Sequence, residues 1–192
     1  MIGELITLLI TSVLINNAVL NQFLGLCPFM GVSRKKSSAL GMGIAVCFVI
    51  VFAGIITYAL YYLVLVPLKL EYMDLVSFIL VVASLVQLTE MFIKKASPSL
   101  YKSLGVYLPL ITTNCVVLNV CLVNISKSYD IPQMLVYTIG TPLGFALVLY
   151  IFSSIRERLD AADIPTSFLG NPIALIVAGL MAMAFSGLGG IV

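Results

Sequence analysis

The sequence predicts an all-α integral membrane protein with six transmembrane helices. Of its 192 residues, 61% are hydrophobic and only 9% are charged, whereas a soluble domain is roughly 45–50% apolar and about 25% charged. Long stretches of the chain carry no charge, and they lack the alternation of apolar and polar residues that a membrane β-barrel shows. Because backbone polar groups cannot stay unpaired in hydrocarbon, these stretches are expected to be helical.

Six charge-free stretches define the expected helices, each of which needs about 20 apolar residues. In chain order they are Leu5–Ser33, Ser37–Leu68, Leu75–Thr89, Ser103–Ser126, Ile131–Ile155 and Ile164–Val192. The third stretch is short unless Glu90 is included, which extends it to Ile93. No connection is long enough for a soluble domain, so residues 1–192 are expected to form a single transmembrane domain.

The basic residues of the connections predict the orientation of the helices. Eight lie in the first, third and fifth connections, namely Arg34, Lys35, Lys36, Lys94, Lys95, Lys102, Arg156 and Arg158. Only Lys69 and Lys127 lie in the second and fourth. Since positive charge accumulates on the cytoplasmic side, both termini are expected to face outward.

The charge balance and the absence of histidine exclude several classes of function. Ten Lys and Arg against eight Asp and Glu leave a net charge of +2, which is too small for a nucleic-acid-binding surface. Without histidine, the commonest proton shuttle and a common metal ligand are missing. Any metal chemistry must therefore rest on the four cysteines.

Two matching segments half a chain apart indicate an internal repeat. Residues 16–21 read Asn-Asn-Ala-Val-Leu-Asn and residues 114–119 read Asn-Cys-Val-Val-Leu-Asn, so four of six positions agree. Each half, 1–97 and 98–192, holds three expected helices, and an odd number inverts the second half relative to the first. Inverted repeats recur in transporters, where broken helices meet near the membrane midplane. Helices one and four are therefore expected to be broken there.

Asparagines, which are unfavourable in a membrane helix, gather in these two segments. They are Asn16, Asn17, Asn21, Asn114 and Asn119, and all five are candidates for an ion pathway. Each could bond across helices or pair with backbone groups freed by a helix break. Backbone pairing is favoured for Asn16, Asn17 and Asn114, while both interpretations stay open for the other two.

Glu90 is the one plausible carboxylate inside the membrane, and it is a further candidate for the ion pathway. An ionisable group in a transmembrane segment suggests a function by default. Glu90 also lies four residues before Lys94, which is the spacing of a helical ion pair. We favour the ion pair near the membrane surface.

Two cysteines lie where the sequence disfavours a helix. Gly25 and Gly31 flank Cys27 and permit unusual backbone dihedrals, and Pro28 biases Cys27 itself away from the helix. Cys27 is therefore expected at a non-helical corner. Cys115 follows three side chains, Thr-Thr-Asn, that compete with the helix for hydrogen bonds.

Straight helices would keep these two thiols apart. Cys27 would lie at the cytoplasmic edge and Cys115 near mid-membrane, about 18 Å away at 1.5 Å per residue. Either the thiols share no site, or helix one is a half-helix followed by a re-entrant stretch that returns Cys27 toward the centre. The other cysteines, Cys47 and Cys121, are interpreted as small core residues.

The segments around the two thiols resemble the signature segments of the RnfA/NqrE family of bacterial membrane proteins, which is related to NqrD and RnfE. The likeness lies in residues 22–33, Gln-Phe-Leu-Gly-Leu-Cys-Pro-Phe-Met-Gly-Val-Ser, and in residues 110–115, Leu-Ile-Thr-Thr-Asn-Cys. It extends over essentially the whole chain, including its length and its six expected helices. The Pro-Phe-Met-Gly continuation after Cys27 is closer to the A-type branch than to the E-type branches.

The resemblance implies an integral component of an electron-transport complex of the bacterial inner membrane. Such a complex oxidises ferredoxin, reduces NAD and exports sodium ions or protons, and this chain alone is not catalytic. In the family, the cysteines matching Cys27 and Cys115 bind one 2Fe–2S cluster together with two cysteines of an inverted homologous partner, RnfE. The count agrees, since such a cluster usually takes four thiolates.

The resemblance also implies further partners and cofactors. The partners are RnfB, RnfC, RnfD and RnfG, with ferredoxin as an indirect partner and the lipid bilayer around them. Flavins, further iron–sulfur clusters and NAD would lie on these other chains of the complex. Three alternatives remain open: a component of a non-redox transporter or channel, the E-type component (NqrE) of a sodium-pumping NADH:quinone oxidoreductase, and a structural scaffold.

Overall fold

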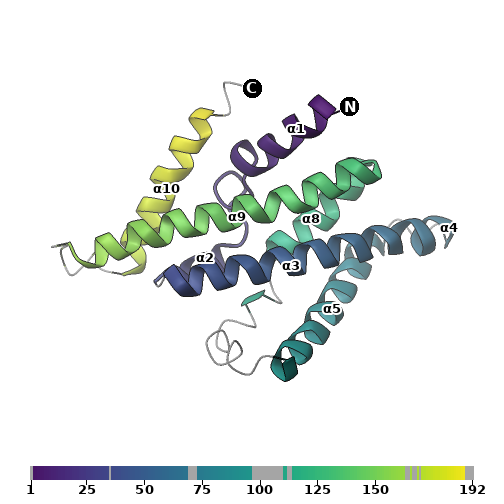
Figure 1. Cartoon of the computed structure of the whole chain (residues 1–192), viewed down its shortest axis with the longest axis horizontal. Coiled ribbons are helices and arrows are strands. Elements are labelled where there is room, and N and C mark those ends of the chain that lie inside the picture. Colours follow the sequence, from purple (N-terminus) through teal and green to yellow (C-terminus); the bar gives the residue numbers. More distant parts are fainter. Residues whose placement is uncertain are drawn as a thin grey trace.

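The fold was analysed in a computed structural model that describes residues 2–34, 36–68, 73–96, 110–111, 114–162, 165, 168 and 170–188. Its elements in those ranges are helices (Figure 1), which confirms the all-α prediction. They are α1 (Ile2–Ile10), the π-helix η1 (Thr11–Ile15), α2 (Leu26–Val32), α3 (Lys36–Leu60), the π-helix η2 (Tyr61–Leu65), α4 (Val66–Leu68), α5 (Asp74–Ala96), α8 (Cys115–Ser126), α9 (Ile131–Asp160) and α10 (Asn171–Leu188).

Two helices of the described part are long and apolar enough to cross a membrane. They are Lys36–Leu65 and Ile131–Asp160, each of 30 residues, and 18-residue windows within them have mean hydropathies of 2.7 and 1.9. Shorter apolar helices follow the remaining expected stretches, at Gly3–Ile15, Leu75–Leu88, Cys115–Ser126 and Asn171–Gly187. Each of the six charge-free stretches therefore contains an apolar helix.

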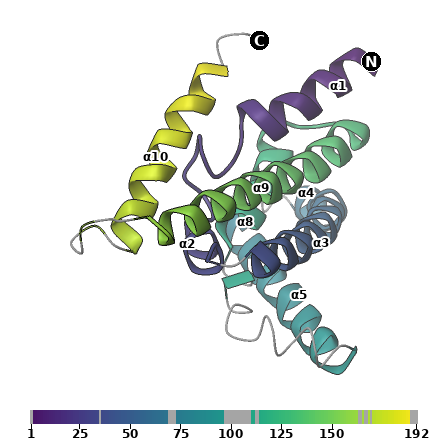
Figure 2. The ribbon, with the colours of Figure 1, turned by 60° about the vertical axis from the view of Figure 1, so that its left-hand side comes forward.

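The helices α3 and α9 form the centre of the molecule and run side by side (Figures 1 and 2). Small residues allow their close approach, because a Cβ built on Gly54 would come within 2.7 Å of Thr138 Cγ2. At one end, Lys36 Nζ lies 2.8 Å from Glu157 Oε2. At the other end, the Tyr58 hydroxyl donates to the carbonyl oxygen of Tyr129 at 3.1 Å. The two helices are therefore antiparallel.

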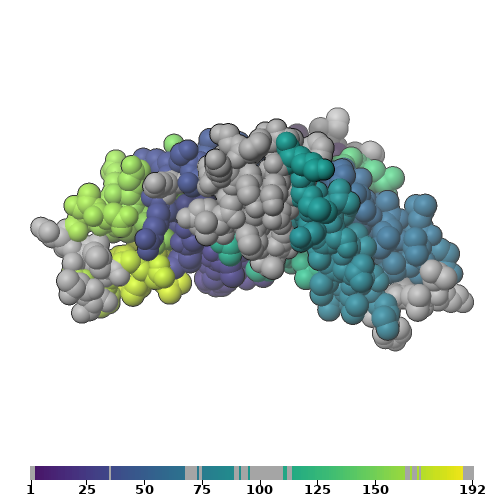
Figure 3. Space-filling view, turned by 90° about the horizontal axis from the view of Figure 1, so that it is seen from below, coloured from purple at the N-terminus to yellow at the C-terminus, as the bar shows by residue number. Residues whose placement is uncertain are grey.

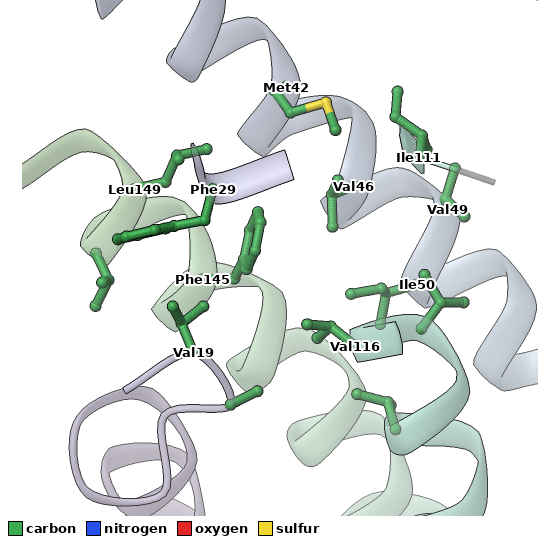
Figure 4. Packing of buried hydrophobic residues seen from close by; sticks show 14 of the residues in the cluster. Val19, Phe29, Met42, Val46, Val49, Ile50, Ile111, Val116, Phe145 and Leu149 are labelled. Atoms are coloured by element: carbon green, nitrogen blue, oxygen red, sulfur yellow. The ribbon is translucent and has the colours of Figure 1, made fainter. Parts of the chain in front are cut away.

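The other helices surround this pair. In Figures 1 and 2, α1 and α10 lie on one side of α9, and α5 lies on the opposite side of the molecule. Figure 3 shows α5 and α10 toward opposite ends of the molecule. The α2 helix packs inside, where the ring of Phe29 lies beside Leu149 and Phe145 of α9 (Figure 4).

Polar and apolar side chains are distributed as in a membrane protein. Large apolar side chains lie on the outside, for example Leu63, which is 75% exposed, and Met183, which is 69% exposed. Polar groups are buried inside, among them Ser12, Asn17, Ser33, Thr57, Asn114, Asn124, Thr138, Thr141, Ser153 and Arg156. A soluble monomer rarely exposes this much contiguous apolar surface, so the outer surface fits lipid or partner subunits.

One helix boundary departs from the prediction. Ile155 was expected to end the fifth helix, with Arg156 and Arg158 in a connection, but α9 continues to Asp160. Arg156 is buried, and its guanidinium donates to groups of two other segments. Hydrogen bonds to this buried arginine hold the last turns of α9 in place, and a charge count along the sequence cannot anticipate them.

Candidate functional site

The first expected transmembrane helix is interrupted, as predicted. Helical structure ends at Ile15 and resumes at Leu26. Asn17 satisfies backbone groups on both sides of its own position, because its Oδ1 accepts from Val19 N and its Nδ2 donates to the Val13 carbonyl oxygen, both at 3.1 Å. These two bonds agree with the expectation that this side chain pairs with freed backbone groups.

The interrupted segment packs against small residues of α9. A Cβ built on Gly144 would lie 2.6 Å from the carbonyl oxygen of Val13 and 2.9 Å from Asn17 Nδ2. A Cβ on Gly140 would collide with Ser12 Oγ. Glycine at these two positions therefore lets the backbone of η1 approach α9 directly.

Within the interruption, the chain turns back on itself before α2 begins. Leu24 N donates to the Ala18 carbonyl oxygen at 2.9 Å, which closes the turn. Gly25 then adopts φ +72 as the N-cap of α2, a left-handed conformation that glycine adopts without steric cost. A Cβ on Gly25 would lie 2.7 Å from Val116 Cγ2 and 3.2 Å from Asn114 Oδ1. The turn is therefore packed directly against the start of α8.

The start of α8 brings the second cysteine to this turn. Asn114 is the N-cap, with an extended backbone, and its Oδ1 accepts from Val116 N at 3.1 Å. Cys115 is the first residue of α8, and its sulfur accepts a hydrogen bond from Gly25 N at 3.3 Å. This contact joins segments 90 residues apart in sequence, and Cys27 lies only two residues beyond Gly25.

Both thiols open onto the surface of the chain. Cys27 and Cys115 are exposed free cysteines, whereas Cys121 is buried and Cys47 is half-buried. We call the group formed by Gly25, Cys27, Asn114 and Cys115 the cysteine junction. Within the described ranges, no three histidine, cysteine or acidic side chains lie together as a metal site would require. The junction therefore presents two free thiols of this chain at its surface.

Comparison with known proteins identifies the family. A family model described as "Rnf-Nqr subunit, membrane protein" matches residues 5–192. The chain belongs to the Rnf-Nqr family. This assignment makes the chain a membrane protein, in agreement with its apolar exterior.

Curated relatives of the Rnf-Nqr chain are similar over almost their whole length. The A-type component of an ion-translocating oxidoreductase complex from Syntrophotalea carbinolica is 54% identical over 189 residues, which cover 98% of each chain. The A-type component of a Na(+)-translocating ferredoxin:NAD(+) oxidoreductase complex from Acetobacterium woodii is 52% identical over 97% of each chain. A relative from Vibrio vulnificus, also named as an A-type component, is 52% identical over 98% of each chain. These names confirm the resemblance to the A-type branch.

The backbone around Cys27 in this Rnf-Nqr chain differs from the expectation. Cys27 lies in the first turn of α2, and Gly31 is helical within the same helix. Pro28 follows in that turn, where a proline is tolerated because its missing N–H has no helical partner there. The conformational break falls at Gly25 instead of at the cysteine.

The remaining candidate asparagines bond to side chains. Asn21 Nδ2 donates to Asn16 Oδ1 at 3.3 Å, so the amide oxygen of Asn16 binds a side chain of the same interruption, and its pairing with backbone groups stays a prediction. Asn119 Nδ2 donates to Gln22 Oε1 at 3.0 Å and thereby links α8 to the interrupted segment. Gln22 was not singled out from the sequence, although it begins the signature segment that includes Cys27.

Glu90 lies within α5, but its side chain and that of Lys94 are outside the described residues. Neither the ion pair nor a place in an ion pathway is tested for Glu90. Asn16 of the interruption, in contrast, lines a cavity. A space of about 210 Å³ is lined by Leu8, Thr11, Ser12, Asn16, Gln22, Val123, Lys127, Tyr129 and Tyr137. It lies between η1 and the turn that joins α8 to α9.

Proposed function

We propose that this chain is the A-type membrane component of an ion-translocating ferredoxin:NAD oxidoreductase complex in the bacterial inner membrane. In this proposal, Cys27 and Cys115 provide two of the four ligands of a 2Fe–2S cluster. The other two thiolates come from an inverted homologous partner, RnfE, and RnfB, RnfC, RnfD and RnfG carry flavins and further clusters. The proposal rests on the Gly25–Cys115 hydrogen bond, which joins the two cysteine-bearing segments.

The residues present fit such a cluster. Two exposed thiols at one junction match half of the usual set of four thiolates. The junction also supplies hydrogen-bond donors: Gly25 N–H already donates to a ligand sulfur. Asn114 Nδ2 is buried and has no partner in the described part of the chain. Since an unsatisfied buried donor is costly, cluster sulfurs would be suitable acceptors for it.

The chain itself fixes the backbone of the two cysteines and places an apolar layer beneath them. The cap at Asn114 fixes the backbone of Cys115, and the left-handed Gly25 fixes the direction in which α2 leaves the turn. Buried apolar side chains, among them Val19, Val116 and Phe145, exclude water beneath the junction. A cluster bound there would supply a one-electron relay inside the membrane.

The proposed topology has six transmembrane helices in two inverted repeats, 1–97 and 98–192, with both termini outside. The Lys36–Glu157 contact brings the first and fifth connections together at one end of the molecule. The fourth connection lies at the opposite end, beside Tyr58. These positions agree with basic connections on the cytoplasmic side. In addition, Asn17 and Asn114 each accept a hydrogen bond from the backbone N–H two residues on, although the sequence match pairs Asn114 with Asn16, one residue away.

We propose that the translocated ion passes the interruption of helix one. The cavity beside Asn16 and Gln22 is lined by hydroxyl and amide groups and, at the turn between α8 and α9, by Lys127. Hydroxyl and amide oxygens are hard ligands suited to sodium. Asn21 and Asn119 bond to these two side chains and so belong to the same polar network. Glu90 remains the carboxylate candidate on α5. Sodium-dependent ferredoxin-driven NAD reduction in sealed vesicles would favour sodium over protons.

Iron analysis and EPR spectroscopy of the purified complex test the cluster. Cys27→Ser and Cys115→Ser are each expected to remove one iron–sulfur signal and about two iron atoms per complex, since the cluster holds two irons. Cys47→Ser is the matched control, because this half-buried thiol lies outside the junction, and it should leave iron and signal unchanged. An intact signal in both junction variants would refute the ligand assignment. If such variants kept ion transport, a non-redox transporter would be favoured.

A further inference from the structure

A buried arginine supports the helix that carries Cys27. Arg156 of α9 is only 3% exposed, although charged side chains are almost never fully buried unless they are paired. The cluster proposal gives this residue no role. In a membrane protein, a buried ionisable side chain suggests a function by default.

The guanidinium of Arg156 joins three segments. Its Nη1 donates to the Met30 carbonyl oxygen and to Ser33 Oγ, both at 2.8 Å, so it binds the C-terminal end of α2. Its Nη2 donates to Asn171 Oδ1 at 3.4 Å, at the start of α10. The guanidinium presents its donors in a rigid planar fork, whereas the three donors of a lysine radiate from one rotatable ammonium and do not reproduce that geometry. A cation at the C-terminus of a helix is also favoured by the helix dipole.

A second contact attaches the same helix to α9. The ring of Phe29 stacks on that of Phe152, with centroids 4.2 Å apart and planes inclined by 26°. Phe152 lies one helical turn before Arg156, so α2 is held by two successive turns of α9. With only seven residues, α2 is too short to be stable alone. Its position, and therefore the position of Cys27, depends on these contacts.

We propose that Arg156 is a positioning residue that fixes α2 against α9 and thereby sets the place of Cys27 in the cysteine junction. It also places a positive charge at the C-terminal end of the helix that carries Cys27. Met30, whose carbonyl oxygen it binds, is three residues after Cys27, about 4.5 Å along the helix axis. The inference rests on the proposed function, because it assumes that Cys27 is a cluster ligand.

The charge and the hydrogen bonds of Arg156 have separable effects. A nearby cation favours the more negative, reduced form of a cluster, so its removal lowers the reduction potential. For a separation of about 12 Å and an effective dielectric constant of about 20, we expect about a tenfold loss in the equilibrium constant for reduction. A tenfold loss equals about 59 mV for one electron. Loss of the fork, in contrast, frees α2 and broadens the EPR signal through heterogeneous ligand positions.

The test measures the EPR signal that Cys27→Ser removes, in purified complexes that carry variants of this chain. Arg156→Gln should broaden that signal and lower its midpoint potential by about 59 mV, a tenfold effect. Arg156→Lys should restore most of the potential but not the sharp signal. Arg158→Gln is the matched control, since it removes an equal charge from an outer position of the same helix, and it should match the wild type.

Different results would overturn the positioning role of Arg156 and the proposed function. A wild-type potential and line shape in Arg156→Gln, or an equal shift in Arg158→Gln, would overturn the positioning role of Arg156. If Arg156→Gln fails to assemble, Ser33→Ala and Arg156→Lys provide the test, and a wild-type signal in both would overturn it. If the wild-type complex lacks a signal that depends on Cys27, the proposed function itself is wrong.

Discussion

Replacing Gly144 by alanine tests whether the interruption of helix one is seated on α9. In the native protein, this glycine faces the backbone of η1, and an added Cβ would lie 2.6 Å from the Val13 carbonyl oxygen. The obstacle is backbone, so a side-chain rotation cannot relieve it. We expect Gly144→Ala to push the interrupted segment away from α9 and to loosen the cysteine junction.

The expected magnitude follows from a matched comparison with Gly41→Ala. A helical Gly→Ala change normally stabilises by about 1 kcal/mol, and a Cβ on Gly41 would meet no atom within 4 Å. Because both glycines are helical, this propensity gain cancels between the variants. What remains at Gly144 is overpacking, which costs typically about 1–3 kcal/mol. For a chain of this size, about 2 kcal/mol corresponds to a fall of roughly 4–8 °C in the unfolding temperature.

The assay is thermal unfolding of the detergent-solubilised protein, followed by the fraction that stays monodisperse after heating. Gly144→Ala should unfold several degrees below Gly41→Ala. Equal unfolding temperatures for the two variants would refute the reasoning, because they would mean that η1 does not rest against this face of α9.

Substitutions at three further positions distinguish strong contacts from weak ones in the same assay. Phe29→Ala should destabilise by about 3–5 kcal/mol, because it removes a fully buried ring that stacks on Phe152, whereas Phe29→Leu should cost much less. Asn114→Ala should cost about 1 kcal/mol through loss of the α8 cap, and Asn114→Ser, which keeps a capping oxygen, should recover most of it. Lys36→Ala should cost less than about 1 kcal/mol, since the Lys36–Glu157 pair is exposed at both ends despite its 2.8 Å distance.

These expectations can each fail in a definite way. A small effect of Phe29→Ala would show that α2 is not anchored through its aromatic ring. An Asn114→Ser variant no better than alanine would mean that the amide acts through its unpartnered Nδ2 and not through its cap. A loss of several kcal/mol in Lys36→Ala would show that this pair contributes much more to stability than an exposed ion pair should.

Features of the site that rest on local chemistry could be predicted from the sequence. Asparagine has few ways to satisfy its amide inside an apolar stretch, so its presence at Asn17 and Asn114 indicated freed backbone groups, and both side chains bond to backbone N–H groups. The re-entrant alternative for Cys27 followed from helix geometry, because a straight helix would have kept the two thiols apart. The hydrogen bond from Gly25 to Cys115 agrees with that alternative.

Features that depend on contacts between distant segments could not be predicted. The burial of Arg156 comes from acceptors 126, 123 and 15 residues away, whereas an arginine after a long apolar run indicates a membrane boundary when only the sequence is considered. The helical state of Cys27 likewise depends on the turn that precedes it. Local propensity placed the break at the cysteine, but packing of Gly25 against Val116 placed it two residues earlier.

The outward orientation of the two junction thiols has a consequence for biogenesis. A metal site divided between two polypeptides cannot be completed by either one, so iron loading can only accompany or follow pairing of the two chains. An orphan copy would present two unprotected thiols, which are open to oxidation. In the proposed complex, cofactor insertion would thus depend on correct pairing. Paired chains would hold the cluster, whereas surplus chains would keep two free thiols.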